Sequence, residues 1–183
     1  MHYAVEVPVG KSGKALQNWI GGYYETGWSI NPHWIAESRL NKNHPITRGV
    51  DDFKVKDEWY FNMRFREGQK GVTTVLEAVP DDNARSGKSS WPRGPKKHIV
   101  EASGKSETLC WSVERVDGGR GVGFTGAHFH SNFADDGFRK LVLNAVAWTA
   151  GLDIPDKGLI THRPNEKELD ENQDFKKPSL SKK

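Results

Sequence analysis

The sequence contains a single cysteine, Cys110. One cysteine excludes an internal disulfide, a Cys-x-x-Cys redox pair and a zinc site built from several thiolates. Cys110 stands between Leu109 and Trp111 with no histidine beside it, which is typical of a buried, unreactive thiol. Any metal ion bound by this chain would therefore need histidine and carboxylate ligands.

Long apolar runs and clustered charge are also missing. No segment approaches the roughly 18 consecutive apolar residues of a membrane-spanning helix. The first residues do not form the basic and then apolar pattern of an export signal. The 27 Lys and Arg residues exceed the 24 Asp and Glu residues by only +3, and they are scattered along the chain. We therefore expect neither a membrane nor a nucleic acid as a partner.

The length of 183 residues, with 35% hydrophobic residues, is suited to one globular core. We expect one domain over residues 1–158. The tail over residues 159–183 is rich in charge and has only isolated apolar residues, which favours disorder. Nothing in the composition excludes a homo-oligomer.

Hydrophobic periodicity predicts a mixed α/β domain. Apolar residues at helical spacing favour helices over 12–20, with Ser12 as N-cap, and over 133–150. Residues 80–97 read as a long surface loop. The sequence Asp117-Gly118-Gly119 is typical of a hairpin turn, so we expect the strands on either side of it to pair antiparallel. The strands predicted from alternation and composition are 2–7, 34–38, 58–65, 72–79, 108–116 and 121–126.

Two histidines, His128 and His130, follow the last predicted strand. Residues two apart on an extended chain point to the same side, so both rings can face one pocket. They could be metal ligands, or one could be a general base and the other a hydrogen-bond donor. The alternative is that one caps the next helix and the other lies in solvent.

Glu58 and Tyr60 form a second group, because their spacing places them on one face of a predicted strand. The alternative is an ordinary surface carboxylate. His2, Glu6 and His33 lie near predicted strand ends, where a lone histidine is more often structural.

Aromatic residues are concentrated in the first third of the chain, Trp34 among them. Aromatic faces suit sugar rings, although each such residue can equally belong to the core. Pro45 and Gly49 predict a turn over 44–49, and His44 could simply cap it.

Several short segments, taken in chain order, together resemble the ThuA-like (trehalose-utilisation type) domain family. They include His-Pro-Ile at 44–46, Asp-Glu-x-Tyr at 57–60 and Gly-Arg-Gly at 119–121. The full set is 2–6, 31–34, 44–49, 57–60, 119–128 and 138–148.

This resemblance implies a flavodoxin-like fold of the class I glutamine amidotransferase type, with a mainly parallel sheet flanked by helices. The first βαβαβ part of that fold would be absent. The abrupt opening, with Met1 followed at once by strand-like residues, agrees with a truncated N-terminus. The resemblance is closest to periplasmic or secreted proteins, although no signal peptide is present in this chain.

The resemblance also implies the location of the site. His2 would lie where an amidotransferase keeps its nucleophilic cysteine, and His128 where it keeps its catalytic histidine. Because no cysteine is there, glutamine hydrolysis through a thioester is not expected. The implied catalytic residues are His128, His2 and Glu58. The implied substrate-binding residues are Tyr60, Trp34, Glu6, His33 and His130.

These residues suit a divalent metal such as zinc, held by His2 and His128, or acid/base work on a small-molecule carbohydrate. The expected function is binding or modifying a sugar or sugar derivative of the trehalose or disaccharide type, as a hydrolase or lyase. The alternative is a noncatalytic sugar-binding or interaction module that kept the fold without its chemistry.

Overall fold

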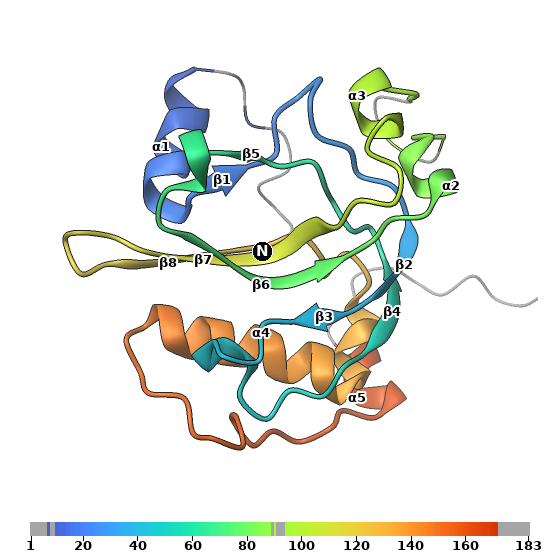
Figure 1. The fold of residues 1–183 in the computed structure, drawn as a ribbon. Helices are drawn as coiled ribbons and strands as arrows, with labels where there is room; N and C mark the ends of the chain where they lie inside the picture. Colours follow the sequence, from blue (N-terminus) through green and yellow to red (C-terminus); the bar gives the residue numbers. More distant parts are fainter. Residues whose placement is uncertain (1–6, 8–9, 89, 91–93, 172–183) are drawn as a thin grey trace, which may run out of the picture.

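The computed structural model describes residues 7, 10–88, 90 and 94–171 (Figure 1). Its centre is a four-stranded sheet in the order β3-β6-β7-β8. Helix α1 lies on one side of this sheet and helix α4 on the other (Figure 1). The four strands are β3 (Arg39–Leu40), β6 (Val72–Ala78), β7 (Glu107–Glu114) and β8 (Arg120–Phe124).

Two small two-stranded sheets adjoin the central one, pairing β1 with β5 and β2 with β4. Their strands are β1 (Gly22–Tyr23), β5 (Arg64–Phe65), β2 (Trp34–Glu37) and β4 (Lys54–Asp57). The helices and 3-10 turns are α1 (Lys11–Ile20), η1 (Pro45–Thr47), η2 (Glu67–Gln69), α2 (Asp82–Arg85), α3 (Lys97–Val100), η3 (His130–Ala134), α4 (Asp136–Thr149) and α5 (Glu166–Asp170).

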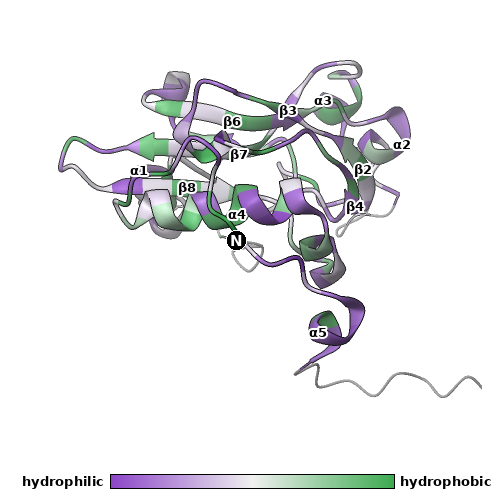
Figure 2. Cartoon of the chain, turned by 90° about the horizontal axis from the view of Figure 1, so that it is seen from below, coloured by the Kyte–Doolittle hydropathy of each residue, from purple (hydrophilic) through white to green (hydrophobic). Residues whose placement is uncertain are grey.

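Helix α4 confirms the helix predicted over 133–150. The Asp135 side chain caps it by accepting the N–H of Phe138 at 2.9 Å. Phe138, Leu141 and Trp148 recur at helical spacing and are buried in the core. Figure 2 shows hydrophobic and hydrophilic residues succeeding one another along the helix, as expected for an element with one face on the sheet.

Helix α1 also forms where the periodicity predicts it, but its first residue differs. Gly10 is the N-cap, and Ser12 lies within the helix, so the prediction of Ser12 as N-cap was wrong. Gly21 ends the helix in the left-handed conformation with φ 87°, which glycine adopts without strain.

The β7–β8 hairpin is confirmed, with Val113 opposite Gly121. Asp117 Oδ1 accepts the N–H of Gly119 at 2.9 Å, and Gly118 takes a positive φ of 80° in the turn.

The mixed α/β class is confirmed, but the mainly parallel sheet is not what the described residues form. All their strand ladders are antiparallel, and parallel pairing occurs only as an isolated bridge between Val7 and Glu25. Parallel neighbours need a crossover connection. The segment between β6 and β7 contains α2 and α3, but it returns the chain antiparallel. Of the strand predicted over 2–7, only Val7 is described, and it forms that isolated bridge; residues 2–6 lie outside the description.

The aromatic segment 58–65 is not a continuous strand. Its backbone is broken at Asn62, which takes a positive φ of 55° that an extended strand does not allow. Trp59 and Phe61 are fully buried in the core on either side of Tyr60. Pairing is limited to an isolated antiparallel bridge between Phe61 and Ile30 and to the short strand β5, so burial of the rings accounts for most of the aromatic content.

The predicted loop over 80–97 contains helix α2, which we did not expect. Asp81 caps it by accepting the N–H of Ala84 at 2.7 Å. Arg85 at its end is 1% exposed and forms an ion pair with Glu107 at 3.0 Å. This pair ties the loop to the start of β7.

In the predicted tail, the structure describes residues up to 171. The short helix α5 corrects the expectation of disorder for five residues, with Asn165 and Glu168 forming a capping box. Residues 172–183 lie outside the description. Among the described residues, no helix has the length and apolar character needed to span a bilayer.

Candidate functional site

Three side chains from separate parts of the chain meet at one end of the fold: His33, Glu58 and His128. His33 immediately precedes β2, Glu58 follows β4, and His128 follows β8. Nδ1 of His128 lies 2.8 Å from Oε2 of Glu58. The rings of His33 and His128 have centroids 5.2 Å apart. One ligand atom from each of the three residues lies within 4.8 Å of the other two.

The β2–β4 ladder brings His33 and Glu58 together. Trp34 is paired with Asp57 in its antiparallel register. The residue before Trp34 and the residue after Asp57 therefore leave the ladder at the same end. This pairing makes neighbours of two residues that are 25 positions apart in sequence.

Asp57 brings the loop carrying His128 to the same place. This carboxylate is 0% exposed, and it accepts backbone N–H groups of Ala127 at 2.9 Å, His128 at 3.0 Å and Phe129 at 3.3 Å. The side chain of Asn132 adds a bond of 2.9 Å. Ala127 has a positive φ of 78°, which is unfavourable for alanine. The hydrogen bonds to Asp57 therefore hold the loop in this conformation.

Glu58 is oriented by polar neighbours. Asn31 Nδ2 donates to Oε1 at 3.0 Å, and the Tyr60 hydroxyl lies 3.4 Å from Oε2 as a donor. Burial, together with the negative charge of Glu58, raises the pKa of Tyr60 well above its usual 10, so its hydroxyl stays protonated. The Glu58 side chain is 14% exposed and that of His128 is 39% exposed, so the pair lies at a boundary between core and solvent.

Phe129 gives the site an apolar wall. Its ring lies 5.2 Å from the His33 ring and 4.9 Å from the His128 ring, measured between centroids. The cluster therefore combines two imidazole rings, one phenyl ring and one carboxylate.

The other predicted site residues are placed differently. Trp34 is 5% exposed and its Nε1 donates to the Trp59 carbonyl at 2.9 Å, so it is a core residue and not a sugar-stacking surface. Tyr60 is also 5% exposed, and only its hydroxyl reaches the site. His130 is exposed and its ring lies on Phe133 at 5.6 Å, outside the three-residue cluster.

His2 and Glu6 lie outside the described residues, so their predicted roles remain predictions. Sequence reasoning missed Asp57 and Asn31. Alternation along an extended strand places Asp57 on the face opposite Glu58 and Tyr60, so the pattern assigns it no role in their group. The signal that could have identified Asp57 is a carboxylate two residues before Trp59 in an aromatic-rich segment, because a carboxylate buried among aromatic residues must find several donors.

His44 serves as the N-cap of η1, in keeping with the simple structural reading. Its Nδ1 accepts the N–H of Ile46 at 3.1 Å, and its Nε2 lies 2.9 Å from the Ser112 hydroxyl. Because Nδ1 is an acceptor, Nε2 carries the proton and cannot activate Ser112 as a nucleophile. Burial lowers the pKa of His44.

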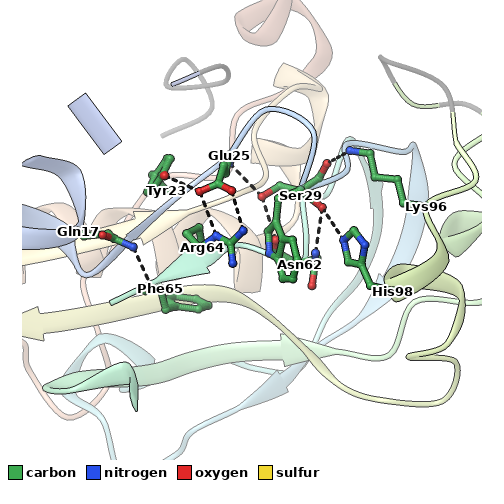
Figure 3. Close-up of polar contacts among 10 residues, drawn as sticks. Gln17, Tyr23, Glu25, Ser29, Asn62, Arg64, Phe65, Lys96 and His98 are labelled. Atoms are coloured by element: carbon green, nitrogen blue, oxygen red, sulfur yellow. Dashed lines mark hydrogen bonds and ion pairs between the residues drawn. The ribbon is translucent and has the colours of Figure 1, made fainter. Parts of the chain in front are cut away.

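A second polar network, shown in Figure 3, joins β1 to β5. Glu25 receives bonds from Arg64 at 2.6 and 3.0 Å and from the Tyr23 hydroxyl at 2.6 Å. Arg64 lies 3.7 Å above the Trp28 ring, which stacks on His98. Hydrogen bonding from Arg64 lowers the pKa of Glu25, and burial raises that of Tyr23 to about 12. Each of these side chains has a partner within the protein, which is typical of a network that stabilises the fold.

A family model described as ThuA, trehalose utilisation, matches residues 2–149. The chain belongs to the ThuA family. The match includes all three clustered residues of the site and ends at the last residue of α4. Neither the curated proteins nor the solved structures contain a match to this ThuA chain.

Proposed function

We propose that this ThuA-family chain binds and chemically modifies a sugar or sugar derivative, such as a disaccharide or its oxidised form, at the site of His33, Glu58 and His128. The observation that carries the proposal is the 2.8 Å contact between Nδ1 of His128 and Oε2 of Glu58. The family description, trehalose utilisation, supports the choice of a carbohydrate substrate.

A carboxylate bonded to Nδ1 fixes the tautomer of a histidine. With Nδ1 donating to Glu58, the neutral His128 ring keeps a lone pair on Nε2. That nitrogen can accept a proton from a sugar hydroxyl, or from a carbon next to the carbonyl of an oxidised sugar. Glu58 would stabilise the imidazolium that forms, as carboxylates do in other acid/base pairs.

The carboxylates of the site favour proton transfer over direct glycoside hydrolysis. A glycosidase of the usual kind needs two carboxyl groups flanking the scissile bond. Glu58 is one candidate, but both oxygens of neighbouring Asp57 are occupied by N–H donors. We therefore favour a lyase-type or isomerising reaction on an oxidised sugar.

A thiol-based reaction is not supported by the described residues. Cys110 is 0% exposed, and burial raises its pKa to about 12. It lies in the middle of β7, whereas the site lies beyond the ends of β4 and β8.

The proposal is tested by ligand titration and turnover assays with trehalose and a keto derivative of a disaccharide. Calorimetry would measure binding, and NMR would follow conversion. We expect the wild-type chain to bind and convert at least the oxidised sugar, and Glu58→Gln to reduce turnover by about 100-fold or more. Asp51→Asn, an exposed carboxylate outside the cluster, is the matched control and should keep wild-type activity.

Two outcomes count against the proposal. Binding of the sugars without conversion by the wild-type chain would favour the noncatalytic module. Absence of binding to both sugars would contradict a carbohydrate function at this site.

A further inference from the structure

We infer that His33, His128 and Glu58 form a mononuclear site for a divalent transition-metal ion, with two histidine ligands and one carboxylate. This inference rests on the proposed function, because it names the cofactor class of the same site. It differs from the sequence-based expectation of a His2 and His128 pair by its ligands, which come from three separate strand ends.

The donor set selects the class of ion. Two imidazole nitrogens and one carboxylate oxygen suit zinc, iron, cobalt, nickel or manganese. Calcium and magnesium prefer oxygen ligands, and a site with two histidines does not suit them.

The spacing of the three groups is close to what an ion requires. Bond lengths of about 2.0 to 2.2 Å place neighbouring ligand atoms about 3.0 to 3.6 Å apart. Glu58 and His128 are already 2.8 Å apart, and the whole set lies within 4.8 Å. A change of roughly 1 to 2 Å at the exposed His33 side chain therefore completes the geometry.

The surroundings of the ligands resemble a preorganised metal site. Asn31 and Tyr60 hold the two oxygens of Glu58, and Asp57 holds the backbone of His128. Such outer contacts orient ligands and strengthen metal binding. An ion would take the place of the proton between Nδ1 of His128 and Glu58, and the negative charges of Glu58 and Asp57 would favour it. The proton of the neutral His128 ring would then lie on Nε2, so in the ion-bound state the ion, and not this nitrogen, would supply the acid/base chemistry of the proposed function.

The site would keep positions open for a substrate. Three protein ligands leave at least one coordination position free, as in catalytic rather than structural metal sites. The histidine rings are exposed, so that position faces solvent. A hydroxyl or carbonyl oxygen of a sugar derivative is the ligand that this position would accept.

Other histidines of the described chain provide matched controls. His130 is exposed only two residues from His128, yet it does not belong to the cluster. His162 pairs at 3.0 Å with Glu168 of α5, the carboxylate that also accepts the N–H of Asn165 in the capping box. If any exposed histidine sufficed for binding, these two would contribute as well.

The test is a titration of the 183-residue, EDTA-treated chain with Co²⁺, followed by its visible absorption, and with Zn²⁺ in competition with a chromophoric chelator. We expect one ion per chain. His33→Ala, Glu58→Gln and His128→Ala should each lower the affinity by at least about tenfold. His130→Ala and His162→Ala should leave it within about twofold. Circular dichroism establishes that each variant is folded.

A measurement on the wild-type chain covers the case in which a variant fails to fold. Mn²⁺ at substoichiometric amounts should broaden the NMR signals of the His33 and His128 rings before those of His130 and His162. Equal broadening of all four, no stoichiometric Co²⁺ binding, or an equal loss of affinity in His130→Ala would overturn the inference.

The design separates this inference from the proposed function. Sugar binding that persists in the metal-free chain, without stoichiometric metal binding, would refute only the metal site. One bound ion per chain without sugar binding or conversion would refute only the carbohydrate function.

Discussion

Replacing Asp57 by asparagine should destabilise the protein and detach the loop of His128 from the site. The carboxylate lies in the core at 0% exposure and accepts hydrogen bonds from residues 127–129, from Asn132 and from the N–H of Glu58. Asparagine has the same shape but carries one acceptor oxygen instead of two. Its NH₂ group would face N–H donors, whichever way the amide is turned.

The expected loss follows from the bonds at each oxygen. Oδ1 accepts from Glu58, His128 and Phe129, whereas Oδ2 accepts from Ala127 and Asn132. If the amide oxygen takes the Oδ1 position, the two bonds at Oδ2 are lost. Hydrogen bonds to a charged group contribute about 1.5 to 3 kcal/mol each. Asparagine is neutral, so the variant no longer has the desolvation cost of a buried charge, and this offsets part of the loss. We expect Asp57→Asn to lower the free energy of unfolding by about 3 kcal/mol.

Urea denaturation followed by tryptophan fluorescence measures this loss, with Asp51→Asn as the exposed control. The control should change stability by less than about 0.5 kcal/mol. In folded Asp57→Asn, NMR signals of the His128 ring should also shift, because the backbone of that residue has lost its anchor. Equal stability of the two variants would refute the role that we assign to Asp57.

Two further predictions concern a glycine and a buried histidine. Gly49→Ala should destabilise the protein by at least about 2 kcal/mol more than Gly104→Ala, measured by urea denaturation. Both glycines have positive φ, 62° and 74°. A Cβ at Gly49 would lie 1.9 Å from the Lys157 carbonyl oxygen, whereas a Cβ at Gly104 would have no atom within 4 Å. Equal losses of unfolding free energy in the two variants would contradict the predicted clash. The pKa of His44 is lowered in the folded protein, so as the pH falls His44 is protonated in the unfolded chain before it is protonated in the folded one. Its contribution to stability is therefore present above pH 6.5, the usual pKa of histidine, and is lost as the pH falls below that value. His44→Asn, which keeps an N-cap acceptor, should lose less unfolding free energy than wild type between about pH 7.5 and about pH 5.5, and an unchanged pH dependence would exclude this role.

Local sequence determined the elements whose signals lie within a few residues. Helix α4 was predictable because its apolar residues recur at helical spacing between an acidic cap and Gly151. The β7–β8 hairpin was predictable because Asp117 and Gly118 favour a tight turn. In both cases neighbouring residues supply the deciding interactions.

Local sequence was misleading where the core decides the conformation. The aromatic residues at 59–61 have high strand propensity, but Trp59 and Phe61 fill the interior and Asn62 breaks the extended backbone. The aromatic character of Trp34 suggests a sugar contact, but its burial and its hydrogen bond to the Trp59 carbonyl place it in the core.

The sequence by itself determined which chemical groups were available for the site: imidazoles and a carboxylate without an accessible thiol. Only the tertiary structure decided which of them meet. His33 reaches Glu58 through the register of β2 and β4, and His128 reaches them because the buried carboxylate of Asp57 must be satisfied by N–H groups of its loop. Strand register and the pairing of a buried charge depend on residues far apart in the chain, so no local pattern specifies them.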